Sequence, residues 1–133
     1  MSQEKKLASI LTETTLKLHE MGLNHGATGN CSCRDEDTFL ITPSGVEIED
    51  LSAEKIIRMD FEGNIINSKL NLKPSSEWRF HQDIFSQRKE IGAVIHTHSI
   101  YASTVSLFNK ELPPFHYMIA VAGGDSVRYA PYA

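Results

Sequence analysis

The sequence has no excess of basic residues and no long apolar run, and each absence excludes a class of protein. Lys and Arg total 13 against 17 Asp and Glu, giving a formal net charge of -4, so the basic surface that drives nucleic-acid binding is not expected. No apolar run approaches the roughly 20 residues that a membrane helix needs, and the first residues lead into a polar helical pattern rather than a signal peptide. We therefore expect a cytoplasmic protein that binds neither nucleic acid nor a membrane.

Cysteine is also scarce, and the two cysteines, Cys31 and Cys33, are separated by one residue. Neighbours that close form a strained disulfide, and no second pair with the spacing of a structural zinc site follows them. A free cysteine behaves as a small hydrophobic residue. We expect both thiols to be reduced and partly buried in a strand.

The overall composition is that of one soluble globular domain, with 41% hydrophobic and 23% charged residues in a chain of 133. We therefore interpret residues 1–133 as a single domain. Apolar residues at helical spacing predict an amphipathic helix over residues 3–21, which Gly22 ends. The following segment, residues 24–30, is rich in Gly and Asn and predicts a loop suited to binding.

The later segments predict strands and helices in alternation. Two hairpins are expected, one from residues 30–34 and 38–42 and one from residues 56–60 and 64–67. Because strands joined by short turns pair antiparallel, we expect an α/β fold in which helices pack on the sheet. Residue patterns predict the remaining elements: helices over 51–55, from about 76 to 85 and over 101–108, and strands over 91–98 and 117–122.

The densest chemical signal is the His-Thr-His segment at residues 96–98. Residues two apart in a strand share a face, so His96 and His98 are expected to project side by side. Two neutral imidazoles placed in this way can bind zinc at about 2.0–2.1 Å. Short motifs of this kind also occur by chance, so unrelated edge-strand histidines are the alternative.

Glu77 is the second candidate, because it follows two serines at the start of a predicted helix. A carboxylate in that position usually interacts with the helix dipole. Beside the His-Thr-His strand, it could instead bind the metal or serve as a general base. Spacing alone does not separate these roles.

Three short segments carry groups that suit a phosphate: residues 26–30, 42–45 and 73–76. Their glycines expose backbone N–H groups, their serines donate hydrogen bonds, and a helix N-terminus near Ser76 favours an anion. Each segment alone is typical of an ordinary turn. Together they indicate a phosphorylated small molecule as ligand.

Five motifs in this order resemble the class II aldolase/adducin family: Gly29-Asn30, Thr42-Pro-Ser-Gly45, Lys73-Pro-Ser-Ser-Glu77, His96-Thr-His-Ser99 and His116-Tyr-Met-Ile119. The resemblance runs from the first helix to the last residue. It implies a largely antiparallel central sheet flanked by helices, and a homotetramer with active sites between subunits. It also implies zinc-dependent aldol cleavage of a phosphorylated ketose, with L-fuculose 1-phosphate as the expected substrate.

Carried over residue by residue, the resemblance implies that His96 and His98 bind zinc and that Glu77 is the catalytic acid/base. Tyr117 would lie near the aldehyde end of the substrate. The family's third zinc histidine would lie beyond Ala133, so we expect this chain to supply two of the three histidines. Phosphate binding is implied for Gly29, Asn30, Ser44, Gly45, Ser75 and Ser76.

Other members of the family provide the alternatives. An L-ribulose-5-phosphate 4-epimerase shares the metal chemistry but usually has Asp at the position of Glu77. Another relative acting on a sugar phosphate, such as a methylthioribulose-phosphate dehydratase, is a further alternative. A non-catalytic module of the adducin type would keep the fold without the metal histidines, and the presence of His96 and His98 argues against it.

Overall fold

The computed structural model describes residues 2–131 of the chain and contains two compact units, the first ending at His98 and the second beginning at Ser99. The first unit holds the helices α1 (Gln3–Glu20) and α2 (Trp78–Gln87) and all the strands of the sheet. The second unit holds helix α3 (Ile100–Ser106) and the 3₁₀ helix η4 (Tyr117–Ala122). Short 3₁₀ turns of the first unit are η1 (Ile48–Asp50), η2 (Ala53–Lys55) and η3 (Lys69–Asn71).

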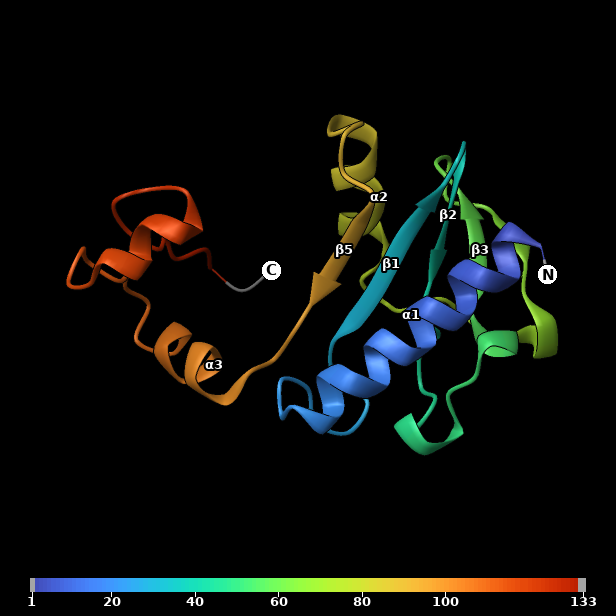
Figure 1. Ribbon diagram of the computed structural model, residues 1–133, viewed down its shortest axis with the longest axis horizontal. Coiled ribbons are helices and arrows are strands. Elements are labelled where there is room, and N and C mark those ends of the chain that lie inside the picture. Colours follow the sequence, from blue (N-terminus) through green and yellow to red (C-terminus); the bar gives the residue numbers. More distant parts are fainter. Residues whose placement is uncertain (1, 132–133) are drawn as a thin grey trace. The chain divides into compact units, whose positions relative to one another are not determined.

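A five-stranded sheet in the order β4-β3-β2-β1-β5 forms the centre of the first unit, and each neighbouring pair is antiparallel (Figure 1). This confirms the expected α/β fold with an antiparallel sheet and flanking helices. Strand β5 follows α2 in the chain but pairs with β1, which places His96 opposite Asn30. The strands are β1 (Asn30–Asp35), β2 (Thr38–Ile41), β3 (Ile57–Asp60), β4 (Ile65–Asn67) and β5 (Ala93–His96).

Two apolar clusters cover the two faces of this sheet. On one face, which we call the α1 face, Leu11 of α1 packs with Cys31 and Leu40. On the other, the α2 face, Phe85 of α2 packs in a cluster with Phe39. Because successive strand residues alternate between faces, the neighbours of Cys31 in β1 belong to the α2 face, where the candidate site lies.

Most of the predicted elements are confirmed, including the first helix, both hairpins and the helices near 78–87 and 100–106. The predicted strand over 91–98 is shorter at both ends, because β5 begins at Ala93 and ends at His96. Beyond it, the backbone N–H of His98 is taken by the loop that precedes β1: it donates to Leu23 O at 3.1 Å and to Asn24 Oδ1 at 2.9 Å. These bonds replace continued pairing with β1.

The predicted strand over residues 117–122 is wrong, because this segment forms the 3₁₀ helix η4. The run is apolar throughout, and periodicity does not separate a short buried strand from a short helix. Its hydrogen bonds are local: Ile119 N–H donates to His116 O, and Gly123 N–H donates to Ala120 O. Gly123 then ends the helix at a φ of 86°, a conformation that glycine adopts without steric cost.

Both cysteines are free, as expected, with Cys31 buried and Cys33 partly buried. Burial raises the pKa of the Cys33 thiol to about 11, and the nearby Asp35 carboxylate adds to this shift. The pKa of Cys31 is also raised by burial. Within residues 2–131, no helix combines the length and hydrophobicity needed to cross a membrane.

Candidate active site

The candidate site of the first unit lies where β1 begins, β5 ends and α2 starts. Asn30 is the first residue of β1, His96 is its partner in β5, and Glu77 is the residue immediately before α2. The pairing register places Asn30 and His96 side by side on the sheet. The turn before α2 adds Glu77 to the same place, since its carboxylate bonds to both of them.

Glu77 makes two short hydrogen bonds through one carboxylate oxygen. Asn30 Nδ2 donates to Glu77 Oε2 at 2.6 Å, and His96 Nδ1 lies 2.8 Å from the same oxygen. The Glu77 side chain makes no capping bond to the helix that follows it. With 38% of its side chain exposed, Glu77 is held by the protein yet accessible to a ligand, which favours a chemical role over a helix cap.

The bond to Glu77 also assigns the two nitrogens of His96. A carboxylate only accepts hydrogen bonds, so the proton between them belongs to His96 Nδ1. In the neutral ring, Nε2 is then left with a free lone pair, which is the form of imidazole that binds a metal. Metal-binding histidines commonly donate their other N–H to a carboxylate in this way.

His98 lies beside His96, with ring centroids 4.7 Å apart. The prediction that the two rings lie together is therefore confirmed, although His98 lies outside the strand. Its position comes from the backbone bonds to the loop before β1, in which Asn24 is only 3% exposed. Sequence reasoning missed Asn24, because nothing in its local pattern signals a buried amide.

Gly29 explains how Asn24 fits into this loop. Its φ is 73°, and a Cβ added there would lie 2.3 Å from Asn24 Oδ1. Any larger residue would therefore push Asn24 away and strain the backbone. Gly29 thus supports the anchor of His98, a structural role that stands beside its predicted role in phosphate binding.

The three predicted residues Glu77, His96 and His98 form a group whose candidate ligand atoms all lie within 4.8 Å of one another, and each side chain is partly buried. Imidazole nitrogen and carboxylate oxygen are the donors that zinc takes in catalytic sites. The residues present therefore fit a divalent metal. Which metal they select is not fixed by this donor set, since cobalt and nickel accept the same ligands.

Behind Asn30, a buried chain of hydrogen bonds continues into the α2 face. His81 Nε2 lies 2.5 Å from Asn30 Oδ1, and His81 Nδ1 lies 2.6 Å from Ser32 Oγ. Both His81 and Ser32 are fully buried. Burial lowers the pKa of His81 to about 4; the nearby His96 lowers it further and Glu77 opposes the shift. The sequence analysis did not select His81, although its position four residues after Glu77 places both on one helical face.

Two of the three predicted phosphate segments lie side by side. Pro43 and Pro74 form an antiparallel bridge, with Ser75 N–H donating to Thr42 O at 3.0 Å and Ser44 N–H to Lys73 O at 2.9 Å. Those two N–H groups are therefore already bonded within the protein. Ser44, Gly45 and Ser76 are exposed, whereas Ser75 is buried and accepts a bond from Glu77 N–H. The phosphate assignments stay predictions.

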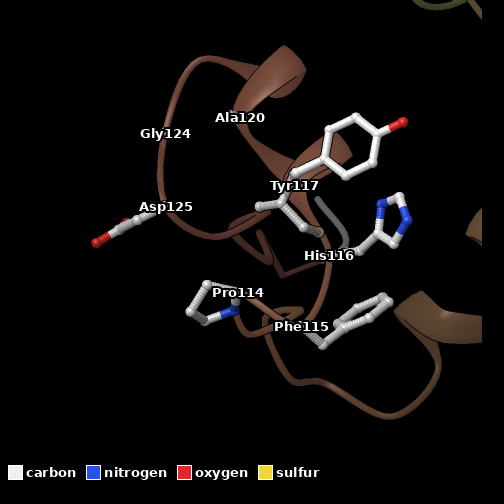
Figure 2. Close-up of a pocket in the computed structure, with 8 residues that line it drawn as sticks. Pro114, Phe115, His116, Tyr117, Ala120, Gly124 and Asp125 are labelled. Carbon is white, nitrogen blue, oxygen red and sulfur yellow. The ribbon is translucent and has the colours of Figure 1, made fainter.

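Tyr117 belongs to the second unit, where it is 79% exposed. Figure 2 shows it in a pocket of that unit with Pro114, Phe115 and His116, its ring lying beside that of His116. The two ring centroids are 4.5 Å apart. The predicted role of Tyr117 toward an aldehyde stays a prediction.

Comparisons with known proteins find aldolases among the relatives of this chain. The L-fuculose phosphate aldolase of Escherichia coli K12 is 43% identical over 131 residues, which cover 98% of this chain and 60% of that protein. A 5-methylthioribulose-1-phosphate/5-deoxyribulose-1-phosphate aldolase of Rhodospirillum rubrum is 42% identical over 123 residues, covering 92% of this chain and 54% of the relative. Both names denote aldolases, which are lyases.

Solved structures of aldolases also match this chain. An L-fuculose 1-phosphate aldolase matches with a TM-score of 0.88 at 37% identity, covering 100% of this chain and 61% of the other. The L-fuculose-1-phosphate aldolase of Thermus thermophilus matches with a TM-score of 0.71 at 26% identity, covering 91% of this chain and 60% of the other. This chain therefore spans between 54% and 61% of the length of these four relatives.

The family model for the class II aldolase and adducin N-terminal domain matches residues 9–133. That range contains the sheet and every residue of the candidate site. The chain therefore belongs to the class II aldolase and adducin N-terminal domain family.

Proposed function

We propose that the protein containing this chain is a metal-dependent aldolase that cleaves L-fuculose 1-phosphate to dihydroxyacetone phosphate and L-lactaldehyde. The observation that carries the proposal is the Glu77 carboxylate, which bonds to Asn30 and His96 next to His98. This arrangement joins an acid/base group to a set of metal-binding side chains, the two components that aldol chemistry without a Schiff base requires. It is supported by the aldolase names of the relatives.

In this proposal His96 and His98 hold the metal, which we expect to be zinc, with a third ligand from the remainder of the protein. A divalent cation held there supplies Lewis acidity toward the carbonyl oxygen of the ketose. The hydrogen bond from His96 Nδ1 to Glu77 fixes the orientation of the imidazole ring. The backbone bonds of His98 to Leu23 and Asn24 hold the main chain from which the second ring projects.

Glu77 is proposed to move the proton. In cleavage, the bond between C3 and C4 of the ketose breaks and its electron pair stays on C3, which then takes a proton from the Glu77 carboxyl group. The hydroxyl on C4 gives its proton to solvent water and becomes the aldehyde oxygen, which we assign to Tyr117 to orient. Glu77 takes a proton back from water after each cleavage, so no net proton is gained or lost. In the reverse reaction, Glu77 as a carboxylate removes the proton from C3. Positioned acid/base groups contribute rate factors of about 10²–10⁴.

The phosphate is proposed to bind at the two paired segments beside Glu77. Ser44 and Ser76 are exposed and carry hydroxyl donors, and Gly45, which follows Ser44, has a φ of 67°. No charge from Lys or Arg is required, since backbone N–H groups and hydroxyls bind phosphate in many loops. The amide of Asn30 is engaged by Glu77 and His81, so its contact with phosphate is the least supported of the six assignments.

A second substrate class has a specific observation in its favour. The Rhodospirillum rubrum relative, which acts on methylthioribulose and deoxyribulose 1-phosphates by its name, is 42% identical to this chain, against 43% for the fuculose phosphate relative. All these substrates are ketose 1-phosphates that break between C3 and C4. The same groups of the first unit would therefore serve either substrate, and the difference lies in the aldehyde half.

The test is an assay of the zinc-loaded full-length protein for release of dihydroxyacetone phosphate. We expect release from L-fuculose 1-phosphate and little from L-fuculose, which lacks the phosphate. A higher kcat/KM for 5-deoxyribulose 1-phosphate would assign the second substrate class. If the zinc-bound protein epimerised L-ribulose 5-phosphate, or released no triose phosphate from any ketose 1-phosphate, the proposal would be wrong. We also propose a cytoplasmic homotetramer, which sedimentation of the full-length protein tests.

A further inference from the structure

Two buried polar side chains of the first unit have no part in the chemistry proposed above. His81 and Ser32 both have 0% exposure, and both lie between the sheet and α2. Burying polar groups is costly unless each finds a hydrogen-bond partner. Here their partners are each other and Asn30, so the chain of bonds ends at the residue that holds Glu77.

The donor and acceptor of each hydrogen bond in this chain can be assigned by starting from the Glu77 carboxylate. Glu77 only accepts, so the Asn30 atom facing it at 2.6 Å is Nδ2, the donor. The other end of the amide, Oδ1, therefore faces His81, and the His81 nitrogen 2.5 Å away must donate. His81 accordingly carries its proton on Nε2, and Nδ1 accepts from the Ser32 hydroxyl at 2.6 Å. Every donor in the chain points toward Glu77.

We propose that His81 is a positioning residue that acts through Asn30: its Nε2–H fixes the Asn30 amide in the orientation that donates to Glu77. This inference rests on the proposed function, because the position of Glu77 matters only if Glu77 transfers the proton. An amide has nearly the same shape in both orientations, so shape alone does not select one. The His81 donor selects it, because the reversed amide would place an N–H against an N–H and an oxygen against a carboxylate.

A residue with a purely structural role would act differently. His81 stacks on Phe80, with ring centroids 4.3 Å apart, and fills space on the α2 face. If packing were its whole contribution, an apolar residue of similar size would replace it. A positioning role instead requires a donor at the end of the side chain, whatever the rest of the residue is.

The test compares His81→Leu, which fills space without a donor, with His81→Gln, whose amide restores an N–H near the position of Nε2. Phe85→Leu is the matched control, because Phe85 lies one turn further along α2, is fully buried and has no part in the hydrogen-bond chain. We expect His81→Leu to lower kcat about 10–100-fold, the range found for residues that orient metal-site ligands, with KM changed much less. His81→Gln should recover most of kcat, and Phe85→Leu should lose thermal stability but keep kcat.

A second readout does not depend on activity. In the NMR spectrum of the metal-free full-length protein at neutral pH, we expect the His81 ring to be the Nε2–H tautomer. The Asn30 side-chain N–H protons should exchange slowly with water in wild type and in His81→Gln, and faster in His81→Leu. An Nδ1–H tautomer would overturn the inference even if His81→Leu did not fold. Equal kcat in folded His81→Leu and wild type would also overturn the inference. A wild type without aldolase activity would contradict the proposed function instead, and the NMR result would still decide the orientation of Asn30.

Discussion

The α1 face and the α2 face of strand β1 have opposite chemistry, although they alternate along the same few residues. On the α1 face, Cys31 and Cys33 pack among apolar side chains of the core. On the α2 face, Asn30 and Ser32 belong to the hydrogen-bond chain that ends at Glu77. A slip of one residue in register would exchange the two sets. The pairing of β1 with β2 on one side and β5 on the other therefore maintains the site as well as the core.

The comparison also shows where polar groups are tolerated. The α1 face ends in an ion-pair group at its solvent edge, where Arg58 bonds to Glu4 at 3.1 Å and to Asp35 at 3.0 Å. The pair of Arg58 with Glu4 is partly exposed, and such pairs contribute little to stability; Asp35 is buried and is paired with Arg58. The polar chain of the α2 face is buried at His81 and Ser32 and contains no ion pair between those two residues. Its groups are all satisfied, which is the condition under which a buried network fixes one arrangement.

The largest expected effect comes from removing a metal-binding side chain of the α2 face. His96→Ala and His98→Ala should each lose the zinc, about one ion per chain in the wild type, together with aldol cleavage. The α1 face is untouched, so both variants should still fold. Metal analysis after dialysis measures the effect, with His25→Ala as control, since His25 is exposed and lies outside the ligand group. Wild-type zinc in both the His96 and His98 variants would contradict the assignment.

A core substitution on the α2 face should separate stability from chemistry. Phe39 is fully buried, and its ring lies 5.8 Å from Phe61 and 5.7 Å from Phe85 between centroids. We expect Phe39→Ala to lower the free energy of unfolding by about 3–5 kcal/mol. Denaturant unfolding measures this loss, and zinc content at low temperature should remain near wild type. Loss of zinc from a variant that is still folded would show that the metal group depends on this cluster.

Acidification should lower the free energy of unfolding, because His81 on the α2 face is buried in its neutral form. The folded-state pKa of His81 is about 4, below its ordinary value of 6.5, so between these values the unfolded chain binds the proton and the folded chain does not. The free energy of unfolding should therefore fall as pH falls through this window, by about 3 kcal/mol in total. His81→Gln removes this contribution, so its stability curve should be flatter between pH 6.5 and 4. Parallel curves for the two proteins would assign the acid sensitivity to other groups.

The smallest expected effect concerns the thiols of the α1 face. Because the pKa of Cys33 is raised to about 11 from 9.0, its thiolate fraction near neutral pH is about 100-fold lower than in the unfolded chain. Alkylation of the folded protein should be slower by at least that factor. Mass spectrometry of the labelled peptide measures it, and rapid labelling of Cys33 in the folded protein would show that the α1 face opens.

The sequence was sufficient to predict the features that depend on local patterns. Alternation and turn residues predicted both hairpins, and the His-Thr-His spacing predicted the neighbouring rings of His96 and His98. The end of β5 and the role of His81 depend on contacts between distant segments, such as the bonds of His98 to Asn24 and of His81 to Ser32. Local patterns carry no information on such contacts. The apolar run at 117–122 was misassigned because its hydrogen bonds, rather than its composition, define it as a 3₁₀ helix.

The most direct test of the central claim is Glu77→Gln, with activity, zinc content and thermal stability measured on the same sample. The substitution keeps the volume of Glu77 and removes its basic carboxylate. We predict a loss of about 10²–10⁴-fold in cleavage of L-fuculose 1-phosphate, with stability near wild type. Measuring zinc on that sample separates a lost base from a lost metal. A variant that holds its zinc and cleaves the substrate within a few-fold of wild type would contradict the account and leave Glu77 as a structural residue.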